Sequence, residues 1–181
     1  MTMKPILLNS CAKAATAKEA RFRINAPIAP ARATRVVALD AAAAPVVRRV
    51  AEQEWADARF FTARPPRGNG AGHLADLVLV GTDGTESRLS DVLTGADVAV
   101  MVATDDDGAE AASAIGDACT LRGIMTAGLV LAAGHGGAGG PGYSVDGHAG
   151  AAVSALRPHA RVIMVTYDEH DVSEVLTALR A

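Results

Sequence analysis

The sequence predicts a single α/β domain: a Rossmann-like parallel sheet with helices on both faces. Three observations support this: a length of 181 residues, a 50% apolar content with only 3% aromatic residues, and apolar runs that alternate with amphipathic segments. This length suits one domain with a full core. Small aliphatic side chains suit helices lying close to a parallel sheet. We expect a basic, irregular arm over residues 1–33 and one nucleotide-binding-type domain over residues 34–181.

The first half of this domain contains three apolar runs that predict strands. Val46, Val47, Val50 and Trp55 recur at helical spacing and predict a helix over residues 44–58, with Pro45 in its first turn. A short helix is expected over residues 87–93, with its three large aliphatic side chains facing inward. The expected strands are Thr34–Leu39, Arg59–Ala63 and Leu74–Val80.

The second half alternates more regularly, which predicts a parallel sheet with right-handed crossovers. Gly123 stands where a left-handed helix terminator is expected. Asp171 and Glu174 form the pattern of a capping box at the start of the last helix. The expected strands are Ala96–Thr104, Ile124–Ala132 and Arg161–Thr166, and the expected helices are Ala109–Arg122, with Ala112, Ile115 and Cys119 inward, Ala149–Leu156 and Asp171–Arg180.

Charge and cysteine content exclude several classes of protein. Residues 1–35 carry seven basic and one acidic side chain, whereas residues 36–181 carry ten basic and nineteen acidic ones. The basic arm lacks the aromatic residues that stack on bases, so we expect a solvated arm, or one folded on its own acidic domain, and no nucleic-acid partner. Cys11 and Cys119 lie far apart, without disulfide or zinc spacing. No apolar run predicts a signal peptide or a membrane span, so we expect a cytoplasmic protein with no membrane partner.

Acidic residues follow several predicted strands and define a candidate metal site. Ligands of open parallel sheets bind at the carboxyl ends of the strands. Asp105, Asp106 and Asp107 follow one strand, and Asp40 and Asp168 follow two others. Carboxylate oxygens at one edge of a sheet suit a divalent metal. The alternative is that these residues only end strands and cap helices, with Asp107 capping the helix that follows it.

The glycine-rich stretch at residues 135–148 has the composition of a phosphate-binding loop but matches neither GxxxxGK[ST] nor GxGxxG in the required strand-to-helix position. We therefore expect a flexible connection there. The five histidines show no i, i+4 pairing, and no serine or cysteine nucleophile is specified. The sequence thus predicts no catalytic residues.

Four stretches of sequence, taken in order, are informative together. They are RVVALDAAAAPVVRRVAEQEWADARFFTA (35–63), RGNGAG (67–72), GADVAVMVAT with RGIMTAGLV (95–104 and 122–130), and AVSALRPHARVIMVTYDEHDV (152–172). This order resembles the GTPase domain of the bacterial tubulin FtsZ, from about Thr34 to the C-terminus. The resemblance implies that Gly70 and Gly72 belong to a loop beside the nucleotide phosphates.

The chain departs from that family at its phosphate loops. Asp40 and four alanines stand where the family has a glycine-rich loop, and their methyl groups would obstruct the approach of backbone amides to phosphate. Residues 104–112, TDDDGAEAA, replace a run of glycines and threonines. Each carboxylate beside a triphosphate would cost about 1 kcal/mol or more, even when screened by water. The chain also stops before the family's second domain and the loop that completes the GTPase of the next subunit.

These departures predict a pseudo-GTPase. We expect a non-catalytic FtsZ-like domain that acts through protein–protein contact or self-association, as a regulator, adaptor or complex subunit, without a bound cofactor. One alternative is a small metal-dependent enzyme or sensor that uses the acidic strand ends. Another is altered nucleotide binding through RGNGAG and HGGAGG.

Overall fold

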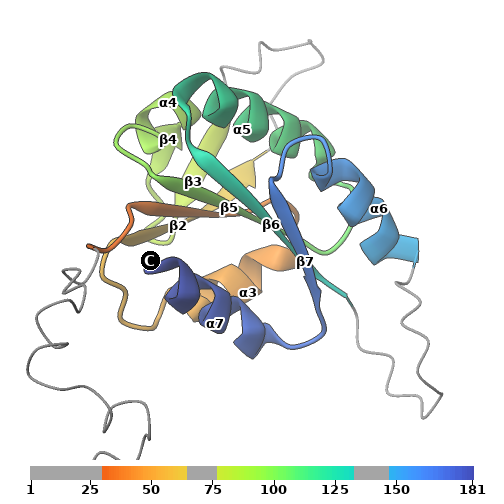
Figure 1. Cartoon of the computed structure of the whole chain (residues 1–181). Coiled ribbons are helices and arrows are strands. Elements are labelled where there is room, and N and C mark those ends of the chain that lie inside the picture. Colours follow the sequence, from red (N-terminus) through yellow and green to blue (C-terminus); the bar gives the residue numbers. More distant parts are fainter. Residues whose placement is uncertain (1–29, 65–76, 133–146) are drawn as a thin grey trace, which may run out of the picture. The chain divides into compact units, whose positions relative to one another are not determined.

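The fold is α/β, with a seven-stranded, mostly parallel sheet flanked by helices (Figure 1). This is a computed structural model, and it describes residues 30–64, 77–132 and 147–181. The strands lie in the order β4-β3-β2-β1-β5-β6-β7. Their bounds are Thr34–Ala38 (β1), Ala58–Arg64 (β2), Val78–Gly81 (β3), Glu86–Arg88 (β4), Val98–Ala103 (β5), Met125–Leu131 (β6) and Val162–Thr166 (β7). The predicted Rossmann-like class is therefore confirmed.

Five of the seven strands are parallel, and the central ones are wholly buried. β1 pairs with β2 on one side and with β5 on the other, and every residue of β1 and β5 is buried. β6 and β7 extend the parallel part. The continuous apolar runs of β1 and β5 are typical of strands covered on both faces.

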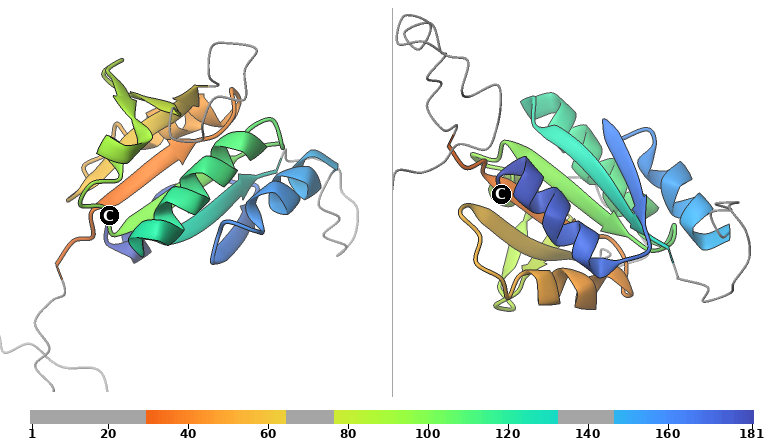
Figure 2. Two further views of the ribbon diagram at one scale, coloured as in Figure 1. Left: turned by 90° about the horizontal axis from the view of Figure 1, so that it is seen from above. Right: turned by 60° about the horizontal axis from the view of Figure 1, so that its bottom comes forward.

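Helices cover both faces of the sheet, as the two further views show (Figure 2). Helices α3 (Ala43–Val50) and α7 (Glu169–Leu179) pack on one face, where Val47 and Leu176 meet the valines of β1 and β5. Helices α4 (Leu89–Val92), α5 (Ala109–Arg122) and α6 (Gly147–Leu156) pack on the other. None of the helices described is long and apolar enough to cross a membrane.

Two expectations for the first half of the domain are wrong. The helix predicted over residues 44–58 ends at Val50, and Trp55 lies beyond it, where its indole Nε1 donates a 2.9 Å hydrogen bond to the Val50 carbonyl. This bond satisfies a carbonyl that a longer helix would have paired internally. The segment expected as one short helix begins instead with β4 and then forms α4.

The sheet is also not parallel throughout. β3 runs antiparallel to β2, and β4 runs antiparallel to β3. A turn with Gly84 at a positive φ of 83° joins them, which glycine adopts without strain. Of the strand expected over Leu74–Val80, the structure describes Leu77 onward, and β3 begins at Val78.

Helix α5 has its predicted bounds and ends at Gly123, whose left-handed conformation confirms the expected terminator. Burial raises the pKa of the Cys119 thiol to about 11, so this residue is a neutral packing group on the inner face. The predicted capping box of α7 is wrong. Asp168 is the N-cap, and its carboxylate accepts a 2.9 Å bond from the His170 amide, while the Asp171 carboxylate accepts from the Thr166 hydroxyl.

Candidate functional site

The candidate site is the crevice where the chain connections leave β1 and β5 in opposite directions. Helix α3, which follows β1, packs on one face of the sheet, and α5, which follows β5, packs on the other. Ligands of open α/β sheets bind at such a switch point, beyond the carboxyl ends of the strands. Asp40 and Thr104 occupy these two ends.

Asp40 is only 7% exposed, and its carboxylate fills the crevice with internal hydrogen bonds. Its Oδ1 accepts from the amides of Ala42 and Ala43 at 3.1 and 2.7 Å, at the start of α3. Across the crevice, Oδ1 accepts from the Thr104 hydroxyl at 2.8 Å and Oδ2 accepts from the Thr104 amide at 2.7 Å. One carboxylate thus links β1, α3 and the end of β5.

The amides at the start of a helix are the groups that bind phosphate in nucleotide-binding folds. Here those of Ala42 and Ala43 already donate to the Asp40 carboxylate. The side chain is an internal anion at the position a ligand phosphate would occupy. A phosphate would have to displace this carboxylate or share the site with it, and two anions in contact repel each other.

The loop after β5 closes the crevice further. Gly108 packs so tightly on the end of β1 that a Cβ atom there would lie 2.5 Å from the Leu39 Cβ and 2.8 Å from the Leu39 carbonyl oxygen. A contact this close requires glycine, although the φ of −88° at this position does not. The loop backbone is therefore held against β1.

The three loop aspartates do not act together. The Asp105 carboxylate accepts from the Asp107 amide at 3.0 Å, whereas the side chains of Asp106 and Asp107 are exposed. The proposed helix cap at Asp107 is wrong, because the N-cap of α5 is Gly108 and no side chain caps that end. Within the three described ranges, no group of three or more histidine, cysteine, aspartate or glutamate residues is placed to hold a metal.

The other predicted site residues lie elsewhere or outside the description. Asp168 caps α7 beside β7 and does not join Asp40. His170 lies on α7, where its Nε2 is 3.6 Å from a Glu174 oxygen. Gly70, Gly72 and residues 135–146 of the glycine-rich stretch lie outside the described residues, whereas Gly147 and His148, at the end of that stretch, begin α6.

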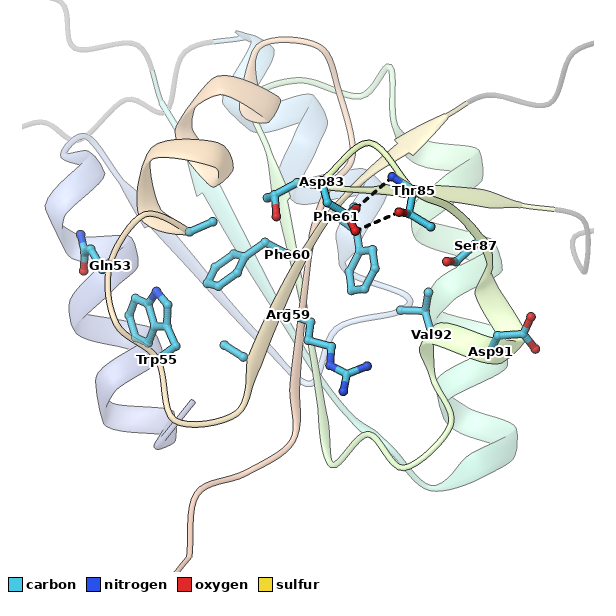
Figure 3. Close-up of a pocket in the computed structure, with 14 residues that line it drawn as sticks. Gln53, Trp55, Arg59, Phe60, Phe61, Asp83, Thr85, Ser87, Asp91 and Val92 are labelled. Carbon is cyan, nitrogen blue, oxygen red and sulfur yellow. Dashed lines mark hydrogen bonds between the residues drawn. The ribbon is translucent and has the colours of Figure 1, made fainter.

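A second hollow, of about 550 Å³, lies beside the amino-terminal half of β2 (Figure 3). Trp55, Phe60 and Phe61 supply its aromatic lining, and the rings of Trp55 and Phe60 are tilted, with centroids 6.0 Å apart. β3 pairs only with residues 61–64 of β2, so residues 58–60 have no described strand neighbour on this side. The sequence analysis missed this hollow, although the single tryptophan and two of the three phenylalanines fall within residues 55–61.

The polar groups around this hollow do not converge on one point. Hydrogen bonds from the Thr85 amide and hydroxyl lower the pKa of the Asp83 carboxyl, so that carboxylate is satisfied by its own turn. The indole N–H of Trp55 is also used internally. In Figure 3 the Arg59 guanidinium lies well apart from the Asp83 carboxylate. The hollow offers a shallow aromatic surface with an unpaired strand end.

Comparison with known proteins adds no family to this geometry. No family model matches the sequence, and no curated protein matches it at a significant level. The likeness to FtsZ therefore stays a prediction from the four sequence segments. What the described residues contribute is a Rossmann-like sheet whose switch point is occupied by its own side chains.

Proposed function

We propose that this chain is a non-catalytic FtsZ-like domain that acts through protein–protein contact, as a regulator, adaptor or complex subunit. The observation that carries the proposal is the Asp40 carboxylate, which accepts from the first amides of α3 and from Thr104. This is the place where a nucleotide-binding relative needs free amide donors. A scaffold whose ligand crevice is filled from within retains its outer surfaces for binding.

The chemistry of the crevice further supports a role without catalysis. In the crevice and in the loop after β5, the carboxylates of Asp40 and Asp105 accept hydrogen bonds from backbone amides, and the side chains of Asp106 and Asp107 are exposed to solvent. Among the described residues of the crevice, the hydroxyl beside a carboxylate is that of Thr104, which donates to Asp40 at 2.8 Å. The same carboxylate also accepts hydrogen bonds from three backbone amides, so it is engaged in holding the structure rather than free to activate a nucleophile. The Asp40–Thr104 contact holds the two strand ends together, which is a structural role.

Calorimetric titration of the full chain with GTP and magnesium tests the proposal. We expect no measurable heat of binding and no release of phosphate over hours. Micromolar affinity or steady hydrolysis would contradict it. Thermal melts with magnesium, calcium, manganese and zinc test the rival metal site, because a ligand that binds only the folded state raises the melting temperature.

The variant Asp40→Ala tests the reason for the absence of binding. It frees the N–H groups of Ala42 and Ala43, which should then donate hydrogen bonds to an external anion. We expect inorganic phosphate to raise the melting temperature of this variant by more than that of the wild type. Asp106→Ala is the matched control, since the Asp106 side chain is exposed and leaves the crevice unchanged. Equal shifts of the melting temperature by phosphate in all three proteins would show that the Asp40 side chain does not block phosphate binding.

A further inference from the structure

Strand β7 has an unpaired backbone edge among the described residues, where it pairs only with β6. The Thr166 carbonyl accepts from the Ala132 amide, so Thr166 directs its backbone groups toward β6. Backbone direction alternates along a strand, so Val162 and Met164 do the same and Ile163 and Val165 point their N–H and C=O groups away from the sheet. These outward groups are a ready template for another strand.

The side chains at this edge are apolar and exposed on one face. Val162 is 61% and Met164 is 42% exposed, on the face that α3 and α7 cover elsewhere. Ile163 and Val165 point to the opposite face and pack against the core there. α7 packs on this face through Val172 and Leu176 and contacts part of β7, but Val162 and Met164 remain exposed. Figure 1 shows β7 at the border of the sheet, with α7 crossing beside α3.

The two ends of β7 carry opposite charge. Exposed Arg157 and Arg161 precede the strand, whereas exposed Asp168 follows it, next to the half-exposed ring of Tyr167. An antiparallel neighbour of the same sequence would bring the basic end of one strand to the acidic end of the other. Complementary charge of this kind favours one register and orientation. The edge is therefore complementary to itself.

We propose that β7 pairs antiparallel with β7 of a second copy of this chain, about a two-fold axis at Met164. In this register Ile163 of each copy faces Val165 of the other, and their outward groups form hydrogen-bonded pairs that exchange both N–H···O bonds. Met164 faces its own counterpart in a non-hydrogen-bonded pair, where side chains lie closest. Arg161 faces the second copy's Tyr167 and lies next to its Asp168.

This inference rests on the proposed function, because it names the partner of a domain that acts through protein contact. One strand pair with a few apolar side chains buries less than the roughly 1,200–2,000 Å² of a standard stable interface. The dimer should therefore be weak and dependent on concentration. It joins the two sheets into one continuous sheet.

Analytical ultracentrifugation of the full chain at roughly 2–200 µM tests the pairing, because this range covers dissociation constants in the micromolar range. We expect a monomer–dimer equilibrium in the wild type and a monomer for Met164→Lys, since two lysines would face each other at the axis. Leu121→Lys is the matched control, because Leu121 is 86% exposed but lies on α5, away from β7. It should dimerise as the wild type does. A monomeric wild type, or a Met164→Lys variant that still dimerises, would overturn the proposal.

Disulfide cross-linking tests the register itself. In a Cys11→Ser background, Met164→Cys should form a linked dimer with oxidised glutathione, since facing Cβ atoms in such pairs lie about 4.5–5.5 Å apart. Val162→Cys is the control, because the two copies of that position would be offset by roughly 13 Å along the strands. Cross-linking of the Val162→Cys variant alone would overturn this register. Cross-linking of neither variant would overturn the pairing of β7 with a second copy.

The two proposals fail separately. A monomeric protein that does not bind GTP would remove the β7 dimer and leave the non-catalytic interaction domain in place. A protein that binds GTP tightly would remove the proposed function, whether or not β7 pairs.

Discussion

The crevice between β1 and β5 and the outer edge of β7 differ in how their polar groups are satisfied. At the crevice, one carboxylate accepts three backbone amides and one hydroxyl, and Gly108 closes the space beside it. At β7, the pairing with β6 implies that the backbone N–H and C=O groups of Ile163 and Val165 point away from the sheet and have no partner among the described residues. The side chains of Val162 and Met164 are exposed there as well. The customary ligand site of this fold is thus saturated by internal hydrogen bonds, whereas the edge strand has backbone groups without a described partner.

The largest effect should follow the loss of the carboxylate at the crevice. Asp40→Ala removes the acceptor of four hydrogen bonds, and we expect a loss of about 2–4 kcal/mol in the free energy of unfolding. Urea denaturation measures it. Asp106→Ala, in the exposed part of the loop, should stay within about 0.5 kcal/mol of the wild type. Equal losses of unfolding free energy in the two variants would mean that the hydrogen bonds of Asp40 contribute no more to stability than the exposed Asp106 side chain does.

A somewhat smaller loss is expected from Gly108→Ala. The added methyl group meets the Leu39 Cβ at 2.5 Å and the Leu39 carbonyl oxygen at 2.8 Å, so the loop must move, at about 2 kcal/mol. The control is Gly150→Ala in α6, where no described atom lies within 4 Å of the new methyl group. There we expect a gain of about 0.5–1 kcal/mol from helix propensity. If Gly108→Ala left the free energy of unfolding unchanged, the loop would not be packed as tightly against Leu39 as these distances indicate.

Amide hydrogen exchange compares the edge with the interior directly. In dilute protein, the outward amides of Ile163 and Val165 should exchange faster than that of Met164, which points into the sheet. At high concentration, pairing with a second copy should slow Ile163 and Val165 and leave Met164 nearly unchanged. Exchange resolved by residue with NMR measures both. Slow exchange at every concentration would show that the edge is covered within one chain.

The smallest effect concerns an ion pair that joins α3 to α7. Arg49 donates from Nε and Nη2 to the two Glu169 oxygens at 2.7 and 2.6 Å, which lowers the pKa of that carboxyl. A lowered pKa in the folded state gives stability that is present above the unfolded pKa, near 4.5, and is lost as the pH falls through the folded value. The Arg49 and Glu169 side chains are 55% and 36% exposed, so the effect is small and sensitive to salt. In Glu169→Gln, the melting temperature should fall slightly less steeply than in the wild type as the pH is lowered from 6 to 3. An equally steep fall in both proteins would contradict this.

Local patterns predicted the parallel core well because burial on both faces leaves continuous apolar runs in β1 and β5, and β6 and β7 are apolar as well, although β7 has exposed residues on one face. The runs of β1, β5, β6 and β7 gave these strands to within two residues at each end. The prediction that the helix continues beyond Val50 was wrong. Trp55 has helical spacing in the sequence, but its indole N–H donates to the Val50 carbonyl at the end of the helix instead of continuing it. The short strand β4 carries no apolar run, and its place depends on pairing with β3.

The site was harder to predict than the fold, for a physical reason. Asp40 and Thr104 were both recognised as strand ends, but the sequence does not show that one carboxylate bonds the amides of α3 and crosses to β5. That contact depends on a register between strands 64 residues apart. A cap at Asp107 was the alternative to a metal site and rested on sequence position alone, whereas the N-cap of α5 is Gly108.

The two borders of the sheet are unequal, and this sets the stoichiometry of any assembly that uses them. β4 is only three residues long, and its exposed ends are the charged residues Glu86 and Arg88, with Glu86 paired to Arg64. Short, charged border strands resist the addition of further strands. If the proposed β7 pairing holds, the described sheet has one receptive border and one blocked border, and so a valence of one through its borders. Such pairing stops at two molecules and does not extend the sheet into a filament.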